Sequence, residues 1–398
     1  MTSYRAAWVV PISRPPIRGG IVTTHNGRIT DSGASTNTSA IDLGDVALMP
    51  GLVNAHTHLE LSYLRRQVPA STEFISWIRT LVAERQKYQP SSPEILLCAA
   101  DGIAEAVACG TALAGDISNT LIGLDLLSAR QLAAVIYHEL IRFRAPDPET
   151  FVADALDRLR ALPSAADVRP SLAAHAPYSV SPGVFRALRA ALDRREVPSV
   201  SVHLSESAEE VEFVRTGSGP WRMFLEEIGA WDSTWTPAGS SPVEYLDAMG
   251  FFDSRVLVVH GVQMSRSDLQ RLAERQVTLV TCPRSNRYTG AGTPPVDAFY
   301  RSGVRVAVGT DSLASTPDLN VFSELAEMRR LAPAVPAFAL LDSATRQGAA
   351  ALGFGADFGT LDSGKRARLL SVSVPPDTSD VEEYLVSGIR SDAIRWVE

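Results

Sequence analysis

Short apolar runs alternate with helix-like segments from about residue 95 to residue 353. The segments Ser181–Leu192 and Ser265–Glu274 have the spacing of amphipathic helices. The apolar runs are rich in β-branched residues, which is typical of strands buried on both faces. Together with a run that ends at His56, they are Thr111–Asp116, Ala133–His138, Val168–His175, Pro198–His203, Arg255–His260, Val277–Cys282 and Val304–Asp311. Strand–helix alternation of this kind predicts an α/β fold with a parallel sheet.

Eight strand–helix units fit a closed barrel better than an open doubly wound sheet. No GxGxxG sequence opens a first helix, as it would in a dinucleotide-binding sheet. We therefore predict a (β/α)₈ TIM-like barrel over residues 49–355.

The two ends of the chain follow a different pattern. Residues 5–47 and 360–398 alternate short strands with turns and show no long helical period. This pattern predicts a small flanking β-sandwich domain formed by both termini, residues 1–48 together with 356–398.

Residues 216–250 form an insertion after the fifth strand. The insertion carries Trp221, Phe224, Trp231 and Trp235. These aromatic side chains either form a lid that stacks on a flat substrate ring or pack as a satellite core against the barrel.

Composition excludes several classes of partner. The 398 residues carry a net charge of −8 without a basic run, so neither nucleic acid nor an anionic membrane is an expected partner. We expect no membrane span, because no apolar stretch reaches 18 residues. Pro11 interrupts the apolar run near the start, which argues against a signal peptide. Three widely spaced cysteines indicate reduced thiols in a cytoplasmic protein. A homodimer is compatible with the sequence.

The histidines carry the chemical signal. His56 and His58 lie two positions apart on an extended segment, so their side chains point the same way. Neutral imidazoles are good ligands for Zn²⁺ or Fe²⁺, although an HxH sequence alone is weak support for a metal site.

Later strands of the predicted barrel also end in polar residues: His138, His175, His203, His260 and Asp311. A barrel brings these strand ends to one face, where enzymes of this fold build their sites. We therefore predict that six of the seven histidines converge on one mouth. Each could instead be a separately satisfied histidine, but their shared position in the topology favours a site.

The sequences PGLVNAHTHLELS, HLSE, VVHGV, TCPRSN and VAVGTDS together resemble the amidohydrolase superfamily, in its branch of cytosine, guanine and adenosine-type deaminases and chlorohydrolases. The matching motifs run from residue 49 to about residue 315. The resemblance implies one divalent metal, Zn²⁺ with Fe²⁺ or Mn²⁺ as alternatives. It makes His56, His58, His203 and Asp311 the ligands.

The resemblance also implies roles for residues beside the metal. Glu206 matches the carboxylate that shuttles protons, with Asp311 sharing the proton transfer, and His260 matches the histidine that polarises the water or the leaving atom. Glu206 could instead be a helix N-terminal acid, since SESAEE resembles a capping box. His175, in HAPYS, matches a position that faces the substrate.

The lysine count limits the number of metals. Binuclear members of the superfamily bridge two metals with a carbamylated lysine on the fourth strand. The only lysines here, Lys87 and Lys365, lie on no predicted barrel strand, which favours a single metal.

The substrate prediction rests on finer resemblances. STEFISWIRTLV resembles the FxxW helix that covers the substrate in this branch, which assigns Trp77 to substrate binding. S-adenosylhomocysteine deaminases carry acidic residues where this chain has Ile75 and Ser76. Glu60 and HAPYS look more like 6-aminodeoxyfutalosine deaminases, so Glu60 joins His175 and Trp77 as an expected substrate contact.

The predicted function is therefore hydrolytic deamination of a small aminopurine nucleoside such as 6-aminodeoxyfutalosine. A chlorohydrolase and a metal-binding relative without turnover are the alternatives. The second alternative predicts damage to Glu206, His260 or Asp311, and all three are present. Glu139 either reaches the pocket or terminates its strand. Arg284 and Asn286 could contact the substrate. A role in forming a turn is an equally good interpretation for Ser285 and Asn286.

Overall fold

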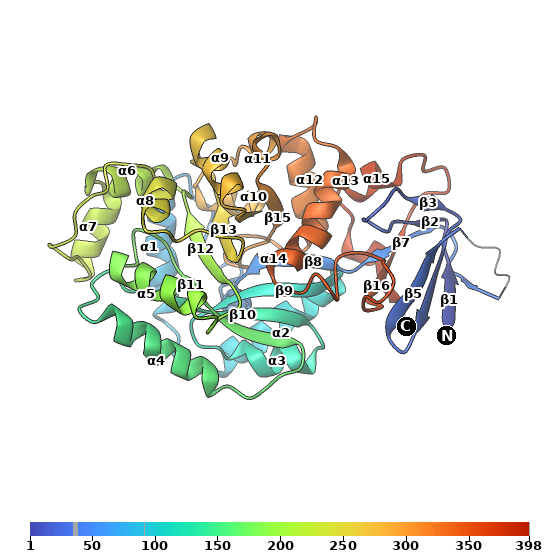
Figure 1. Ribbon diagram of the computed structural model, residues 1–398, viewed down its shortest axis with the longest axis horizontal. Helices are drawn as coiled ribbons and strands as arrows, with labels where there is room; N and C mark the ends of the chain where they lie inside the picture. Colours follow the sequence, from blue (N-terminus) through green and yellow to red (C-terminus); the bar gives the residue numbers. More distant parts are fainter. Residues whose placement is uncertain (35–38, 91, 398) are drawn as a thin grey trace.

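The centre of the computed structural model is a sheet of eight parallel strands that neighbour one another in chain order (Figure 1). The structure describes residues 1–34, 39–90 and 92–397. The eight strands are β8 (Leu52–Thr57), β9 (Thr111–Ser118), β10 (Ala133–Leu140), β11 (Val168–Ala174), β12 (Val200–Leu204), β13 (Val256–His260), β14 (Thr278–Thr281) and β15 (Arg305–Val308). Each lies within or overlaps the run that predicted it.

The first and last regions of this sheet meet and close it into a barrel. Thr57 and Asp311 form a parallel bridge. The Asp311 N–H donates to the His56 carbonyl at 3.1 Å, and Thr57 Oγ1 donates to the Asp311 carbonyl at 3.0 Å. The predicted (β/α)₈ architecture is confirmed.

Helices connect the strands and cover the outside of the barrel (Figure 1). The predicted helices begin where expected, because Ser181 and Ser265 accept hydrogen bonds from the backbone N–H groups of Val184 and Asp268. The helices are α1 (Phe74–Arg85), α2 (Pro93–Ala108), α3 (Gly123–Ala129), α4 (Pro148–Arg160), α5 (Pro182–Asp193), α6 (Ala208–Thr216), α7 (Pro220–Glu227), α8 (Pro242–Ala248), α9 (Arg266–Glu274), α10 (Pro283–Thr289), α11 (Val296–Ser302), α12 (Val321–Leu331), α13 (Ala337–Asp342), α14 (Gly348–Ala351) and α15 (Val381–Leu385). Among the described residues, no helix combines the length and the apolar character needed to cross a membrane.

Two glycines allow close packing against β8, the strand that carries the HxH sequence. A Cβ atom at Gly309 would lie 2.7 Å from the His56 carbonyl oxygen. A Cβ atom at Gly115 would lie 2.4 Å from the Ala55 carbonyl oxygen. Since real Cβ atoms do not approach backbone this closely, only glycine fits on either side of β8.

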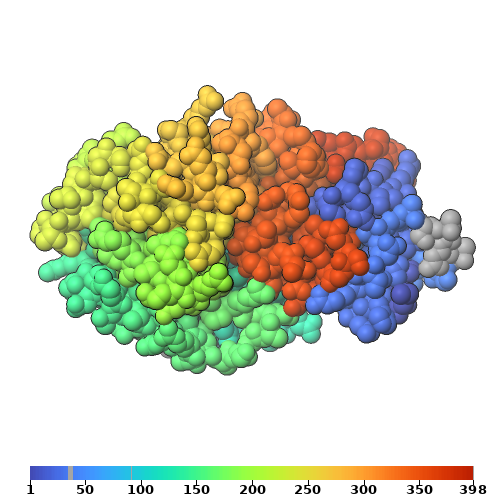
Figure 2. Space-filling model, in the orientation of Figure 1, coloured from blue at the N-terminus to red at the C-terminus, as the bar shows by residue number. Residues whose placement is uncertain are grey.

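The termini build the predicted β-sandwich at one end of the molecule (Figures 1 and 2). Tyr4 and Val22 of one sheet pack with Val9, Leu48 and Leu369 of the other. The sheets have the strand orders β5-β4-β1-β6 and β17-β16-β7-β2-β3. These strands are β1 (Thr2–Arg5), β2 (Trp8–Val9), β3 (Ile17–Arg18), β4 (Ile21–His25), β5 (Arg28–Gly33), β6 (Ile41–Asp42), β7 (Val46–Pro50), β16 (Leu369–Ser373) and β17 (Ile394–Val397). The expected boundary after residue 48 falls within β7, which leads through Gly51 into β8.

The tryptophans of the insertion are packed against aromatic neighbours. Trp221 stacks on Tyr178, with ring centroids 3.6 Å apart, and Trp235 stacks on Phe213 at 4.9 Å. Trp221 and Trp235 are 2% and 9% exposed. Both rings belong to the same hydrophobic cluster as residues of the barrel, and Trp221 also forms part of a cleft wall described below.

Candidate active site

Three histidines meet at the C-terminal mouth of the barrel. His56 and His58 come from the end of β8, and His203 comes from β12. One ring nitrogen of each lies within 4.8 Å of the other two. The closest approach is 3.2 Å, between Nε2 of His56 and Nε2 of His203.

Asp311 brings a carboxylate to the same point from beyond the end of β15. Its Oδ1 lies 3.5 Å from His58 Nε2 and 3.8 Å from His56 Nε2. Its Oδ2 accepts hydrogen bonds from the hydroxyl groups of Ser285 and Ser315. The backbone φ of Asp311 is +62°, a conformation that costs energy for a residue with a side chain. Asp311 is therefore held with one oxygen facing the histidines.

These four side chains fit a tetrahedral divalent metal. Zn–N distances of about 2.0–2.1 Å in a tetrahedron place the ligand atoms about 3.3 Å apart, close to the 3.2, 3.5 and 3.8 Å separations observed. Burial and the neighbouring His58 lower the pKa of His56, and burial and His56 lower the pKa of His203. Burial alone would raise the pKa of Asp311, but His58 and His56 hold it at about 2. Neutral imidazoles with an ionised carboxylate are the forms that metal binding requires.

A second group of possible ligands shares His203. Glu139, His175 and His203 also place ligand atoms within 4.8 Å of one another. However, His203 Nδ1 lies 3.0 Å from the His175 carbonyl oxygen, which can only accept, so this nitrogen carries a hydrogen. His203 therefore has one lone pair for a cation, on Nε2, and that nitrogen faces His56.

Glu206 and His260 lie side by side next to the histidine cluster. Glu206 Oε1 lies 3.6 Å from His260 Nε2, and both side chains are buried. Asn286 Nδ2 donates to His260 Nδ1 at 3.0 Å, so the hydrogen of the neutral ring is on Nε2, beside Glu206. Burial raises the pKa of Glu206 well above its ordinary value, Asp311 raises it further, and burial lowers the pKa of His260 to about 4.

Glu210, and not Glu206, caps the N-terminus of α6, so the carboxylate of Glu206 is not engaged in capping. Ser207 is the N-cap of α6, and its Oγ accepts from the Glu210 N–H. The two carboxylate oxygens of Glu210 accept from the backbone N–H groups of Ser205 and Glu206 at 2.8 and 2.9 Å.

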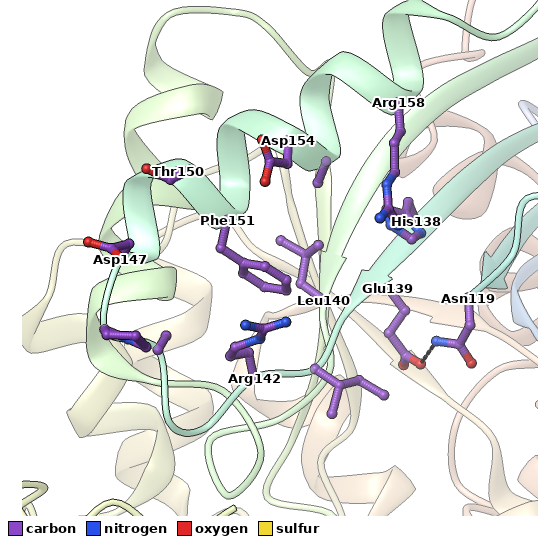
Figure 3. Close-up of a pocket in the computed structure, with 14 residues that line it drawn as sticks. Asn119, His138, Glu139, Leu140, Arg142, Asp147, Thr150, Phe151, Asp154 and Arg158 are labelled. Carbon is purple, nitrogen blue, oxygen red and sulfur yellow. Dashed lines mark hydrogen bonds between the residues drawn. The ribbon is translucent and has the colours of Figure 1, made fainter.

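The prediction that six histidines converge is wrong for His138. His56, His58, His175, His203 and His260 are joined by a chain of ring contacts. Side chains alternate along a strand, so adjacent residues of β10 face opposite ways. Glu139 lines the cavity at the histidine cluster. His138 does not line that cavity; together with Glu139 it lines a second cavity, between β10 and α4, where it lies beside Arg158 (Figure 3).

The predicted substrate contacts separate in the structure. His175 and Trp77 line the cavity at the histidine cluster, which has a volume of about 80 Å³. The lining of this cavity does not include Glu60, whose carboxylate accepts hydrogen bonds from the loop after β9: from Ser118 Oγ, Asn119 N–H and Thr120 N–H and Oγ1. Arg284 also lies elsewhere, paired with Asp318 at 2.8 Å.

A larger apolar cleft adjoins this inner cavity. It has a volume of about 550 Å³. His175, Tyr178, Leu81 and Ile141 line both spaces. Its outer wall includes the aromatic rings of Phe143, Trp221 and Phe224. A ligand can therefore reach from the histidine cluster into an apolar outer region.

Comparison with known proteins identifies the family. The model of the amidohydrolase family matches residues 47–390, which is most of the chain. The chain belongs to the amidohydrolase family. The match includes each of the residues that form the histidine cluster and its carboxylates.

Curated relatives of this amidohydrolase are deaminases. The 5-methylthioadenosine/S-adenosylhomocysteine deaminase of Nitratidesulfovibrio vulgaris is 30% identical over 365 residues, covering 85% of this chain and 76% of the relative. The aminodeoxyfutalosine deaminase of Deinococcus radiodurans is 32% identical over 330 residues, covering 79% and 75%.

Solved structures share the whole architecture. An adenosine deaminase from Xanthomonas campestris with bound zinc has a TM-score of 0.81 and 28% identity, covering 99% of this chain and 90% of the other. The Helicobacter pylori aminofutalosine deaminase has a TM-score of 0.84 over 100% and 98% of the chains. At 24% identity, that second likeness supports the fold alone.

Proposed function

We propose that this protein is a hydrolytic deaminase of an aminopurine nucleoside that uses one divalent metal, most simply Zn²⁺. The observation that carries the proposal is the convergence of His56, His58 and His203 on Asp311, with Glu206 beside His260 at the same mouth. The reaction breaks a carbon–nitrogen bond of a cyclic amidine and releases ammonia.

His56, His58, His203 and Asp311 would hold the metal. When bound, a divalent ion supplies Lewis acidity that lowers the pKa of water to about 7. The hydroxyl groups of Ser285 and Ser315 keep Asp311 oriented, since both donate to Oδ2 and leave Oδ1 beside the histidines.

Glu206 is the proton carrier of the proposal. Its raised pKa lets one carboxyl group accept a proton from the attacking water and pass it to the ring nitrogen of the substrate. The second proton of that water passes from the added oxygen to the amine, with Asp311 sharing the transfer, so that the carbon–nitrogen bond breaks, ammonia leaves and the oxygen becomes a carbonyl. His260 Nε2–H donates toward the oxygen that becomes the new carbonyl, and Asn286 keeps the ring in that tautomer.

The shape of the site supports a nucleoside with a further substituent. The inner cavity is small and Trp77 is in its wall, which suits a flat heterocycle. The adjoining cleft has room for an apolar substituent on the sugar. The deaminases named above act on 5-methylthioadenosine, S-adenosylhomocysteine or aminodeoxyfutalosine, and we propose 6-aminodeoxyfutalosine as the first substrate to test.

The deciding experiment measures ammonia release from a panel of aminopurine nucleosides and pyrimidines. The enzyme is loaded separately with Zn²⁺, Mn²⁺ and Fe²⁺. Ammonia release from an aminopurine nucleoside, lost in Glu206→Gln, is the expected result. A matched 6-chloropurine nucleoside separates deamination from dehalogenation through chloride release. Preferred chloride release, or no turnover with any metal, would overturn the proposal.

A further inference from the structure

Glu139 is a buried carboxylate that the mechanism above does not use. It lies on β10 and is 7% exposed. Its Oε2 accepts a hydrogen bond from Asn119 Nδ2 at 2.8 Å (Figure 3). Its Oε1 is buried and has no hydrogen-bond partner among the described residues. Buried acceptors without a partner are rare and call for an explanation.

The orientation of this carboxylate is fixed by its neighbours. Arg85 donates to Asn119 Oδ1 at 2.7 Å, so the amide presents its Nδ2 to Glu139. The Asn119 backbone N–H donates to Glu60 Oε1 at 2.8 Å, which holds the loop itself. Because Oε2 is engaged in this way, Oε1 is the free acceptor.

Within the part of the chain that the structure describes, no group donates a hydrogen bond to Oε1. Its near neighbour is His203 Nδ1 at 3.9 Å, and that N–H is already donated to the His175 carbonyl. A second metal at this point would need a lone pair that His203 Nδ1 does not have. Oε1 is therefore an acceptor for a hydrogen-bond donor that the described residues do not supply.

His175 offers a second acceptor at the same place. Ser179 Oγ donates to the Ala176 carbonyl at 3.1 Å, so it accepts from His175 Nδ1–H at 2.6 Å. The lone pair of neutral His175 is then on Nε2. Both Glu139 and His175 line the inner cavity, and His175 also lines the outer cleft. The pair thus lies between the metal ligands and the apolar region.

We propose that Glu139 is a specificity-determining residue that accepts a hydrogen bond from a sugar hydroxyl of the substrate, with His175 receiving the adjacent hydroxyl. The inference rests on the proposed function and assigns the part of the nucleoside between the ring and its outer substituent. An O–H···O hydrogen bond is about 2.8 Å long. One carboxylate oxygen of Glu139 and one ring nitrogen of His175 lie within 4.8 Å of each other. Two hydroxyl groups on adjacent carbon atoms of the sugar can therefore each donate to one of these two acceptors.

The test combines removal of the Glu139 carboxylate with removal of the sugar hydroxyl groups. Deamination of 5′-methylthioadenosine is compared with that of its 2′,3′-dideoxy analogue, using the wild-type enzyme and Glu139→Gln. The wild type should prefer the ribonucleoside by roughly 100-fold in kcat/KM, because a site built to bind a hydroxyl discriminates strongly against its loss. In Glu139→Gln the preference should fall below about 10-fold, through a higher KM for the ribonucleoside.

Two further variants test whether the effect is specific to the Glu139 carboxylate. Asn119→Ala frees Oε2 without removing the acceptor, so it should lower the preference by less than Glu139→Gln does. Glu149→Gln, at an exposed position in the first turn of α4, should leave both substrates unaffected. Metal content is measured for every variant.

Failure of the inference about Glu139 can be distinguished from failure of the proposed function. If the wild-type enzyme deaminates both substrates equally well, the inference is wrong while the proposed function stands. If Glu139→Gln keeps the wild-type preference, Glu139 does not bind the sugar. Loss of metal in Glu139→Gln would make it a ligand instead. If neither nucleoside of this pair nor any other in the panel releases ammonia, the proposed function fails first.

Discussion

Ser285 Oγ donates a hydrogen bond to Asp311 Oδ2, and this contact turns Asp311 Oδ1 toward His56 and His58. Ser285 lies in the first turn of α10, which follows β14, and Asp311 lies after the next strand, β15. The hydroxyl group of Ser285 therefore orients the carboxylate that we propose as a metal ligand.

Ser285→Ala should weaken metal binding by about 10- to 100-fold, the usual effect of removing a residue that orients a ligand. Competition with a chromophoric chelator measures this directly. Ser128→Ala, which removes a hydroxyl bonded within α3 to the Leu124 carbonyl, is the matched control. Wild-type affinity in Ser285→Ala would show that Ser315 alone suffices to orient Asp311.

The purified protein should bind about one divalent metal per chain, since one set of four ligands converges and His203 has a single lone pair to offer. Elemental analysis after growth with added metal gives the ratio. Lys87 pairs with Glu84, and Lys365 Nζ donates to the Gly355 and Phe358 carbonyls, so neither lysine is at the site. A ratio of two would require ligands beyond the four proposed.

Asp311→Asn should abolish turnover while part of the metal remains bound. The amide keeps the size of the side chain, and the three histidines still converge. Activity and metal content are measured on the same preparation. Turnover above a few per cent of the wild-type rate would remove Asp311 from the proton transfer.

Glu206→Gln should keep its metal and lose at least roughly 100-fold in kcat, the scale of a lost general acid–base group. Glu210→Gln gives the contrast, because Glu210 caps α6. It should lower the melting temperature by an amount equivalent to about 1–2 kcal/mol. An unchanged kcat in Glu206→Gln, with a lower melting temperature, would make Glu206 a structural residue.

Gly309→Ala should destabilise the barrel and weaken metal binding together. The added methyl group would lie 2.7 Å from the His56 carbonyl oxygen, so β8 must shift. Overpacking of this kind costs about 1–3 kcal/mol. Gly33→Ala, where a methyl group meets nothing within 4 Å, is the control for thermal unfolding. Equal stability of the two variants would show that β8 tolerates the shift.

Much of the fold could be predicted because parallel strands buried on both faces are continuous apolar runs. The same property hides which residue of such a strand faces inward. In Ala133–Leu140 both faces are apolar until His138 and Glu139, so the alternation gives no sign of direction. The inward position is set by pairing with β9 and β11, which involves residues distant in sequence.

The distinction between Glu206 and Glu210 also needed the folded backbone. Both acids follow His203 within a few residues and lie in SESAEE, where a helix-terminal role was considered for Glu206 alone. Ser205 adopts a left-handed φ of +52°, and the chain reverses there so that Glu210 reaches back to its N–H. A local turn of this type is not encoded by a glycine or by the apolar pattern, so no sequence signal marks it.

The bridge between Thr57 and Asp311 joins positions 254 residues apart. During synthesis, the chain emerges from the ribosome with His56 and His58 first, which are two of the four proposed ligands. The other two are widely spaced along the chain, since His203 is on β12 and Asp311 follows β15 at the seam. If these four residues hold the metal as proposed, the complete ligand set would form only when the barrel closes.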